Sequence, residues 1–164
     1  MKILNQNQIQ QKIKRLSYEI IENNFNEPEI YLAGINNNGS GFAKMLMKEL
    51  KKRASTKFHL CQLSINPKEP NTHPVTLDID PQELNGKVLI IVDDVANTGR
   101  TLFYAMQPIL ETLPKKVEMA VLVDRKHKSF PITPDYVGLS LATTMQENID
   151  VRIKDDSKQS VYLK

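Results

Sequence analysis

The chain has 164 residues, enough for one domain with a single sizeable core, and we expect residues 1–164 to form one such domain. A hydrophobic share of 40% and a charged share of 25% are ordinary for a soluble globular protein, and the net charge of +3 is too small to indicate nucleic-acid binding by itself. One cysteine, Cys61, excludes an internal disulfide and fits a reducing compartment. No signal-peptide pattern opens the chain and no apolar run approaches the ~20 residues that span a bilayer, so we expect a cytoplasmic protein.

The first part of the chain predicts two helices and a buried strand. Over residues 6–24, apolar side chains recur every three or four positions, as on one face of a helix: Ile9, Ile13, Leu16 and Ile20. The apolar run 29–34 predicts a strand, and the Asn- and Gly-rich cluster 36–41 predicts a turn. Ser40 is a candidate cap for a second helix that reaches about Arg53.

The rest of the chain predicts one long loop and further strands. Residues 57–65 are expected to form a strand in which Cys61 is a buried structural thiol. Four prolines make 66–81 a loop. The remaining predicted elements are a strand over 87–93, a helix over 99–113 that is irregular at Pro108, strands over 117–123 and 135–138, and a terminal hairpin of 149–153 and 160–163 around a polar turn, 154–159.

Strands that alternate with helices indicate an α/β fold, in which helices cover both faces of a parallel sheet. Sheets of this class bind their ligands beyond the carboxyl ends of the strands. The end of the strand at 87–93 is therefore the first place where functional residues are expected.

The segment 88–101 carries the strongest chemical signal. Its apolar strand runs into two carboxylates, Asp93 and Asp94, and a small polar loop leads into the next helix. Unpaired backbone amides at a helix start suit a phosphate group, and Thr98 and Thr101 add hydroxyl donors. The carboxylates would repel a phosphate, so we expect them to accept hydrogen bonds from vicinal sugar hydroxyls instead.

Three other classes of site fit this segment less well. Residues 90–94 also look like a Walker B strand, but the chain has no Gly-x-x-x-x-Gly-Lys-Ser/Thr loop. A receiver domain carries its acidic pair after the first strand, and too few residues follow position 94 to complete such a domain. Gly34, Gly39 and Gly41 lack the spacing of a dinucleotide-binding loop. A core strand that ends in a solvated aspartate pair is the remaining alternative.

On these residues the chain resembles the type I phosphoribosyltransferase family, whose members bind 5-phosphoribosyl-1-pyrophosphate (PRPP). The family's signature is similar to Val92–Val95 followed by Thr98–Thr101. Ala120–His127 and Pro131–Gly138 are similar to segments of the PyrR group, pyrimidine operon regulators that are also uracil phosphoribosyltransferases. The likeness covers nearly the whole chain in order and is strongest over 88–144.

The resemblance implies a parallel-sheet core with a small C-terminal hood that grips a nucleobase, and Mg²⁺ bound with the pyrophosphate and the ribose hydroxyls. It implies that the ribose is held by Asp93 and Asp94, which would contact the metal indirectly. The 5′-phosphate would be held by Ala96, Asn97, Thr98, Gly99, Arg100 and Thr101. The pyrophosphate loop would consist of Ile35, Asn36, Asn37, Asn38 and Gly39. The base would stack on Tyr136, be read by the backbone of Val137, and lie near Arg125.

Two departures from the family pattern bear on activity. Purine enzymes of the family usually have an aspartate where this chain has Asn97, and an amide cannot accept a proton at neutral pH, which favours a pyrimidine. The family's pyrophosphate loop usually carries a cation where this chain has Asn36–Asn38, and the loop at 66–80 is short with Lys68 as its one cation. Two missing cations, at ~1.5–3 kcal/mol per charged hydrogen bond, would slow turnover while binding persists.

Three functions follow from the resemblance. The first is an enzyme that joins uracil to PRPP to give UMP and pyrophosphate. The second is a catalytically weak regulator or sensor of PRPP or nucleotides, which acts on RNA in one version. The third is a purine salvage enzyme, which Asn97 disfavours. The resemblance also implies a homodimer through the first helix or the terminal hairpin, with no membrane partner.

Overall fold

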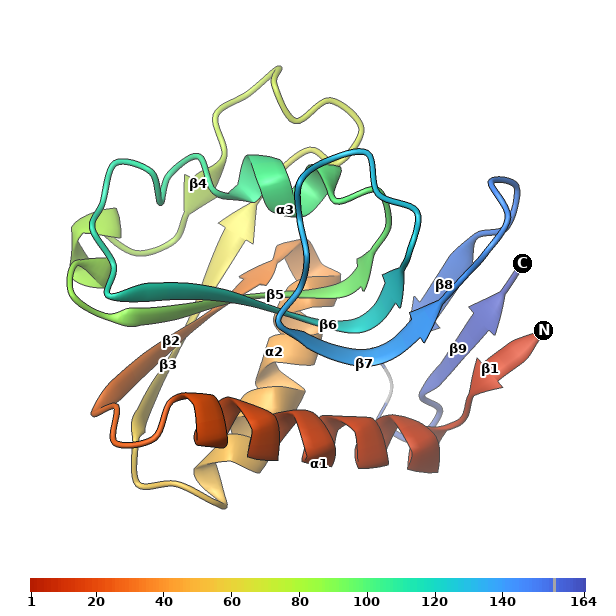
Figure 1. The fold of residues 1–164 in the computed structure, drawn as a ribbon, viewed down its shortest axis with the longest axis horizontal. Helices are drawn as coiled ribbons and strands as arrows, with labels where there is room; N and C mark the ends of the chain where they lie inside the picture. The colour runs from red at the N-terminus through yellow and green to blue at the C-terminus, as the bar shows by residue number, and fades with distance from the viewer. Residues whose placement is uncertain (155) are drawn as a thin grey trace.

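The computed structural model describes residues 1–154 and 156–164, and Figure 1 shows its layers. The elements in chain order are β1 (Lys2–Leu4), α1 (Gln6–Asn23), β2 (Glu29–Ile35), α2 (Asn36–Lys51), β3 (Lys57–Ser64), β4 (Thr76–Leu77), the short 3-10 helix η1 (Pro81–Leu84), β5 (Val88–Ala96), α3 (Arg100–Ala105), β6 (Lys116–Arg125), β7 (Tyr136–Leu141), β8 (Ile149–Arg152) and β9 (Ser160–Leu163).

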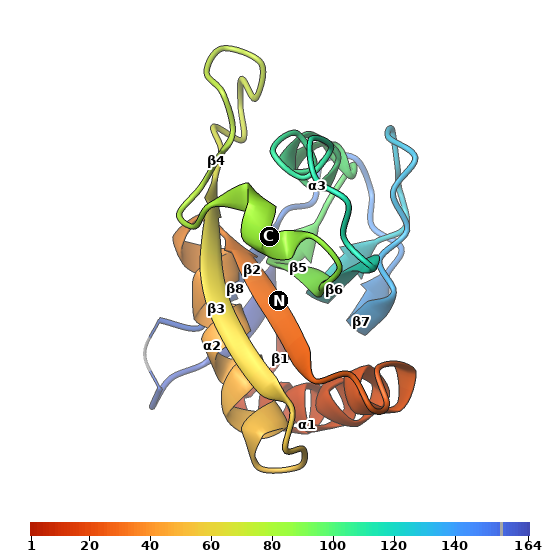
Figure 2. The ribbon, with the colours of Figure 1, turned by 90° about the vertical axis from the view of Figure 1, so that its left-hand side faces the viewer.

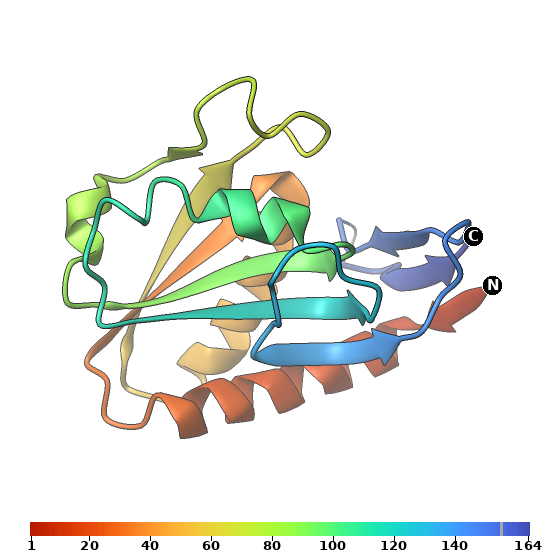
Figure 3. The ribbon, with the colours of Figure 1, turned by 45° about the horizontal axis from the view of Figure 1, so that its top comes forward.

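A six-stranded sheet with the order β4-β3-β2-β5-β6-β7 forms the centre of the molecule. Its five long strands are parallel, and only the two-residue β4 runs antiparallel, against the end of β3. The carboxyl ends of the parallel strands therefore meet at one edge, toward which the arrowheads of β5, β6 and β7 point in Figure 3. The predicted α/β fold is confirmed.

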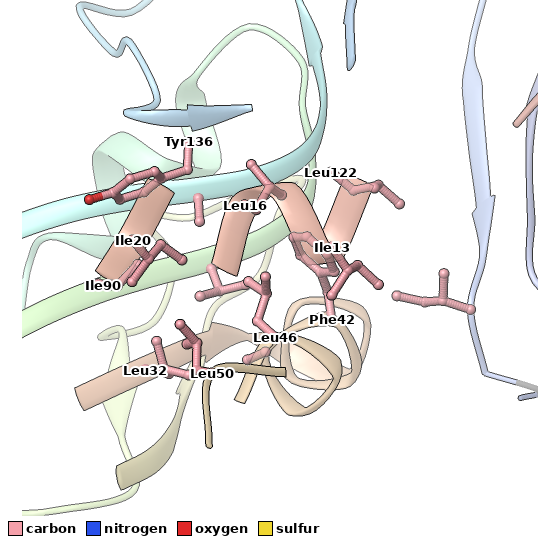
Figure 4. Packing of buried hydrophobic residues seen from close by; sticks show 14 of the residues in the cluster. Ile13, Leu16, Ile20, Leu32, Phe42, Leu46, Leu50, Ile90, Leu122 and Tyr136 are labelled. Carbon is pink, nitrogen blue, oxygen red and sulfur yellow. The ribbon is translucent and has the colours of Figure 1, made fainter. Parts of the chain in front are cut away.

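Alternate residues of each central strand enter two separate cores. Ile30 and Leu32 of β2 pack with α1 and α2 on one face, whereas Tyr31 and Ala33 pack with α3 on the other. Figure 4 shows the first core, where side chains of α1 and α2 lie together with Leu32 of β2 and Ile90 of β5. The predicted inward face of α1 is confirmed, because its four regularly spaced apolar residues are all fully buried.

The turn predicted over 36–41 is wrong, because those residues form the first turns of α2. The helix begins directly after β2, and its N-cap, Ile35, offers no side-chain cap, so the predicted capping role of Ser40 is also wrong. Ser40 lies one turn inside the helix and donates to the side chain of Gln62 at 3.1 Å. A Cβ on Gly34 would lie 2.4 Å from the Ser40 Cα, so the absence of a side chain at Gly34 lets helix and strand approach this closely.

The helix predicted over 99–113 is much shorter than expected. α3 ends at Ala105, and turns that include Pro108 continue to about residue 112. Proline cannot donate the next helical hydrogen bond, which explains the early end. Both β4 and η1 lie in or beside the stretch predicted to be a loop, and Figure 2 shows the rest of that loop projecting from the molecule beyond β4.

The terminal hairpin is confirmed, and it is part of a three-stranded antiparallel sheet with the order β1-β9-β8. The sequence did not predict that β1 would join it through Lys2 and Leu4. This small sheet lies beyond the carboxyl edge of the large sheet (Figure 3). Asp155, within the predicted turn 154–159, lies outside the described residues. No helix in the described part of the chain has the length and apolar character needed to cross a membrane.

Cys61 lies in β3, is 3% exposed, and packs in the core on the α3 side, as predicted. Burial, helped by the nearby negative charges of Asp78 and Glu83, raises the pKa of its thiol to about 12. The reactive thiolate is therefore scarce at pH 8. We expect iodoacetamide to alkylate the native chain on the order of a hundredfold more slowly than the urea-unfolded chain. Mass spectrometry of timed samples measures both rates, and equal rates would show that the thiol is accessible in the native fold.

Candidate functional site

Two adjoining hollows lie at the carboxyl edge of the large sheet. One, of about 580 Å³, is lined by Pro67, Lys68, Asp93, residues 95–102 and Asn148. The other, of about 450 Å³, is lined by Ile35, Asn36, Asn37, Asn38, Pro67, Asp93, Asp94, Val95, Asn97, Thr101, Ile149 and Lys154. We call them the loop hollow and the junction hollow, after the 96–101 loop and the β2–α2 junction. They share five lining residues, including Asp93 and Thr101, so together they form one basin.

Asp93 and Asp94 end the buried part of β5 and face this basin. The Asp93 carboxylate accepts the Asp94 amide at 2.9 Å, and the Asp94 carboxylate accepts the Val95 amide at the same distance. Burial and the neighbouring charge of Asp94 raise the pKa of Asp93 well above its usual range. Burial also raises the pKa of Asp94, against hydrogen bonds from its surroundings that favour the charged form. Such a pair is stabilised by hydroxyl donors or by a cation.

The loop from Ala96 to Thr101 is held in place from two sides. The Thr98 carbonyl accepts the amides of Ser129 and Phe130 at 2.9 and 3.1 Å. The Arg100 guanidinium donates to the Pro67 carbonyl at 2.8 Å, so this side chain braces the loop. Gly99 has a φ of 87°, a left-handed conformation that favours glycine, and a Cβ there would lie 3.1 Å from Ile132.

This loop offers backbone amides and threonine hydroxyls to the loop hollow. A helix dipole adds little here, because α3 has only six residues. The loop amides and the hydroxyls of Thr98 and Thr101 are therefore the groups available to an anion here.

The β2–α2 junction forms the opposite wall of the basin. Asn36 has a left-handed φ of 50°, and its side chain is clasped to Ile65, accepting the backbone amide at 3.0 Å and donating to the carbonyl at 2.9 Å. The Asn36 amide is thus committed to structure, while Asn37 and Asn38 also line the junction hollow. A Cβ on Gly39 would lie 2.6 Å from the Val92 carbonyl, so only glycine allows this approach to β5.

Arg125 lies at the carboxyl end of β6, where each nitrogen of its guanidinium donates a hydrogen bond. It donates to the Thr143 hydroxyl at 2.7 Å, the Thr144 carbonyl at 2.9 Å and the Asn97 side chain at 3.3 Å. Lys128 also donates to the Asn97 carbonyl, at 3.1 Å. Arg125 therefore joins the 96–101 loop to the segment that leads to the hairpin, and Asn97 is held from that side.

The prediction that Tyr136 stacks on a base is wrong. Tyr136 is 1% exposed and lies in the core between the sheet and α1 (Figure 4), where its hydroxyl donates to the buried Glu118 carboxylate at 2.7 Å. It opens β7 opposite Ala120 of β6, far from the carboxyl end of the strand. Val137 is not brought into the basin either, because its carbonyl accepts Arg15 of α1 at 3.0 Å and it lines neither hollow.

Several lining residues were missed by sequence reasoning. Pro67 comes from the loop after β3, of which the sequence had singled out only Lys68, whereas Asn148, Ile149 and Lys154 come from the C-terminal hairpin. No motif surrounds them, and they join the site only because the small sheet lies beyond the carboxyl edge. An expected hood over that edge was the one signal that could have pointed to the hairpin residues.

The acidic pair fits a magnesium ion that a substrate brings with it. No group of three or more metal-binding side chains occurs among the described residues, so a metal cage made by the protein alone is not found there. Mg²⁺ is commonly held by one or two carboxylates together with water and phosphate oxygens. Asp93 and Asp94 supply that number of carboxylates at the edge of a basin large enough for a sugar phosphate.

The chain belongs to the phosphoribosyltransferase family, because residues 2–156 match the model of the phosphoribosyl transferase domain. Within it, the chain is similar to curated relatives named "Bifunctional protein PyrR". It is 35% identical to the one from Fusobacterium nucleatum, over 98% of this chain and 96% of the relative. It is 36% identical to the one from Clostridium perfringens, over 98% of this chain and 95% of the relative.

Solved structures of the same family share the fold. A hypoxanthine-guanine phosphoribosyltransferase from Bacillus anthracis is similar with a TM-score of 0.73 at 21% identity, covering 86% of this chain and 82% of that one. A hypoxanthine phosphoribosyltransferase from Staphylococcus aureus gives a TM-score of 0.72 at 18% identity, covering 88% and 80%.

The burial of Tyr136 generates a test of its role. The Tyr136→Phe substitution removes the hydroxyl donor from a buried carboxylate, so we expect a loss of about 1–3 kcal/mol in the free energy of unfolding. We expect the affinity for any nucleobase to stay unchanged. Urea unfolding and substrate titration measure the two effects. The matched control is Tyr104→Phe, since no hydrogen bond of the Tyr104 hydroxyl occurs within the described residues. A weaker base affinity at unchanged stability would restore the stacking role.

Proposed function

We propose that this protein transfers the 5-phosphoribosyl group of PRPP to uracil, giving UMP and pyrophosphate. The observation that carries the proposal is the basin at the carboxyl edge, where a buried acid pair lies beside a braced loop that carries backbone amides and threonine hydroxyls. Membership of the phosphoribosyltransferase family and similarity to PyrR relatives over nearly the full chain support it.

Each wall of the basin has a role in this proposal. Residues 96–101 hold the 5′-phosphate through backbone amides and the hydroxyls of Thr98 and Thr101. Asp93 and Asp94 accept hydrogen bonds from the ribose hydroxyls, which favours ionised carboxylates. The junction at 35–39 faces the pyrophosphate. In the reaction the bond between C1 and the pyrophosphate oxygen breaks, a ring nitrogen of the base bonds to C1, and that nitrogen loses its proton.

Mg²⁺ would be held by the pyrophosphate and ribose oxygens of the substrate, with Asp93 and Asp94 contacting it indirectly, and it would supply positive charge to the departing pyrophosphate. The protein's own residues orient the sugar so that C1 faces the base. Preorganised donors around the pyrophosphate stabilise its developing charge. The close packing of Gly39 against β5 keeps these two walls in register.

Asn97 supports a pyrimidine over a purine. Its side-chain oxygen already accepts Arg125, and an amide takes no proton at neutral pH. A purine enzyme of this family would have an aspartate at this position to receive a proton from the ring. In the family pattern, enzymes that act on uracil do without an aspartate at this position.

The ribose grip is tested by Asp94→Asn. The amide cannot replace the carboxylate as a charged acceptor, so we expect PRPP affinity to fall about tenfold or more. Stability should not fall, because the substitution relieves repulsion between two neighbouring carboxylates. Titration calorimetry with PRPP and Mg²⁺ measures the affinity. Asp80→Asn serves as the control, because Asp80 caps η1, a role that asparagine fills equally, and it lines neither hollow. Unchanged PRPP affinity would contradict the assignment.

A panel of nucleobases tests the reaction. We expect pyrophosphate release with uracil, PRPP and Mg²⁺, and none above background with hypoxanthine or guanine. Release with a purine but not with uracil would replace the pyrimidine proposal by purine salvage. If none of the bases causes pyrophosphate release although PRPP binds, the sensor described next is favoured over the enzyme.

The second candidate is a sensor that binds PRPP or a nucleotide with little turnover. It is favoured by the β2–α2 junction, which carries three asparagines and no cation, with Asn36 committed to Ile65. Such a sensor either binds RNA or acts without it. A gel shift with pyrimidine leader RNA, with and without UMP, separates the versions, and absence of binding in both conditions removes the RNA version.

We further propose a homodimer and a cytoplasmic location. α1 exposes Tyr18 on its outer face, and Phe25 is 76% exposed just after the helix, which is consistent with contacts of α1 to a second copy. Sedimentation equilibrium gives the oligomeric state.

A further inference from the structure

We propose that Lys154 of the C-terminal hairpin supplies the positive charge that faces the pyrophosphate of PRPP, where the β2–α2 junction has none. This inference rests on the proposed function and assigns to it a residue that no motif identifies. The chemical group recognised is a magnesium-bound diphosphate.

Lys154 lies on the correct wall of the basin. It lines the junction hollow together with Asn37, Asn38 and the acid pair, although it comes from the opposite end of the chain. The lysine is exposed, and its ammonium pairs with no carboxylate or carbonyl of residues 1–154 and 156–164. In our proposal, this ammonium is the group that meets the diphosphate.

The backbone that carries Lys154 is anchored on both sides. The preceding residue, Ile153, is 6% exposed and packs in the core beside α1 and α2. After the turn, Gln159 is 4% exposed and its side chain accepts Gln10 of α1 at 2.8 Å. Gln6 donates to the Asp156 carbonyl at 2.7 Å. These contacts hold the hairpin against α1, so the backbone on both sides of Lys154 is anchored.

The other cations around the basin are engaged or lie elsewhere. Arg100 braces the Pro67 carbonyl, and Arg125 is bound to Asn97, Thr143 and Thr144. Lys68 lines the loop hollow. Among the lining residues that the structure describes, Lys154 is the one lysine or arginine in the junction hollow.

Lys154 offsets the repulsion between a bound diphosphate and the acid pair. A diphosphate that enters beside Asp93 and Asp94 meets two carboxylates, and a cation within hydrogen-bond reach offsets that repulsion. Lysine presents a compact ammonium on a flexible stem, which can follow the pyrophosphate as it departs. The asparagines of the junction add neutral donors but no charge.

A second groove touches the same residue. Lys154 also borders a second groove, which is lined by Lys44 and Lys48 of α2 and by Lys52 just after the helix. Glu49 lies in that groove as well and pairs with Lys52. A polyanion bound there would depend on the α2 lysines, whereas a diphosphate in the basin depends on Lys154 and not on Lys48.

The test compares three ligands on the full chain with Mg²⁺ by titration calorimetry: PRPP, inorganic pyrophosphate and ribose 5-phosphate. For Lys154→Gln we expect the affinities for PRPP and pyrophosphate to fall about tenfold or more, from the loss of one charged hydrogen bond. Affinity for ribose 5-phosphate should stay unchanged, because that ligand lacks the diphosphate. Lys154→Arg should retain binding, and Lys158→Gln, in the same hairpin turn, and Lys48→Gln, on α2, should behave as wild type.

Each outcome decides a separate point. Wild-type binding of ribose 5-phosphate and PRPP with no effect of Lys154→Gln overturns the role of Lys154 and leaves the proposed function standing. An equal loss for all three ligands, or the same loss in Lys48→Gln, also overturns it. A wild-type chain that binds neither PRPP nor ribose 5-phosphate overturns the proposed function, and this inference with it.

Discussion

The site depends on the close approach of the start of α2 to the end of β5. A Cβ on Gly39 would lie 2.6 Å from the Val92 carbonyl oxygen and 3.3 Å from the Asp93 carboxylate. This contact places the β2–α2 junction directly against the end of β5. The wall that faces a diphosphate and the wall that holds a sugar are therefore fixed relative to each other by backbone packing.

The buried acid pair determines the electrostatics of the basin. Two adjacent carboxylates with raised pKa values are costly to bury, and such strained electrostatics are common at functional sites. The arginines nearby do not neutralise them, because Arg100 and Arg125 join loops to one another. In our proposals, the positive charge comes from a metal carried by the substrate and from Lys154.

The two ends of the chain build the hood together. β1 pairs with β9, and the amino group of Met1 donates to the Leu163 carbonyl at 2.5 Å, so the termini lie side by side in Figure 3. α1 then runs from β1 under the large sheet and holds the hairpin through Gln6 and Gln10. The N-terminal segment thus positions hairpin residues that line the basin, even though it contributes none itself.

Local patterns in the sequence determined most of the secondary structure. A helix buried on one face requires apolar residues every three or four positions, as in α1. A strand buried on both faces requires a continuous apolar run, as in β2, β5 and β6. Both patterns can be read from the order of residues alone. The failures have local causes too. Asparagine and glycine indicated a turn at 36–41 because both favour turns, but packing of Gly34 and Gly39 against neighbouring backbone makes the same residues a helix start.

By itself, the sequence determined the α/β class, the phosphoribosyltransferase resemblance and the segment 93–101, because these are contiguous and depend on one strand–loop–helix unit. Only the tertiary structure decided that Tyr136 belongs to the core and that Lys68 and Lys154 line the basin. A motif specifies residues that are neighbours in the chain, whereas the register of β7 and the place of the hairpin come from long-range strand pairing and packing, which no short pattern encodes.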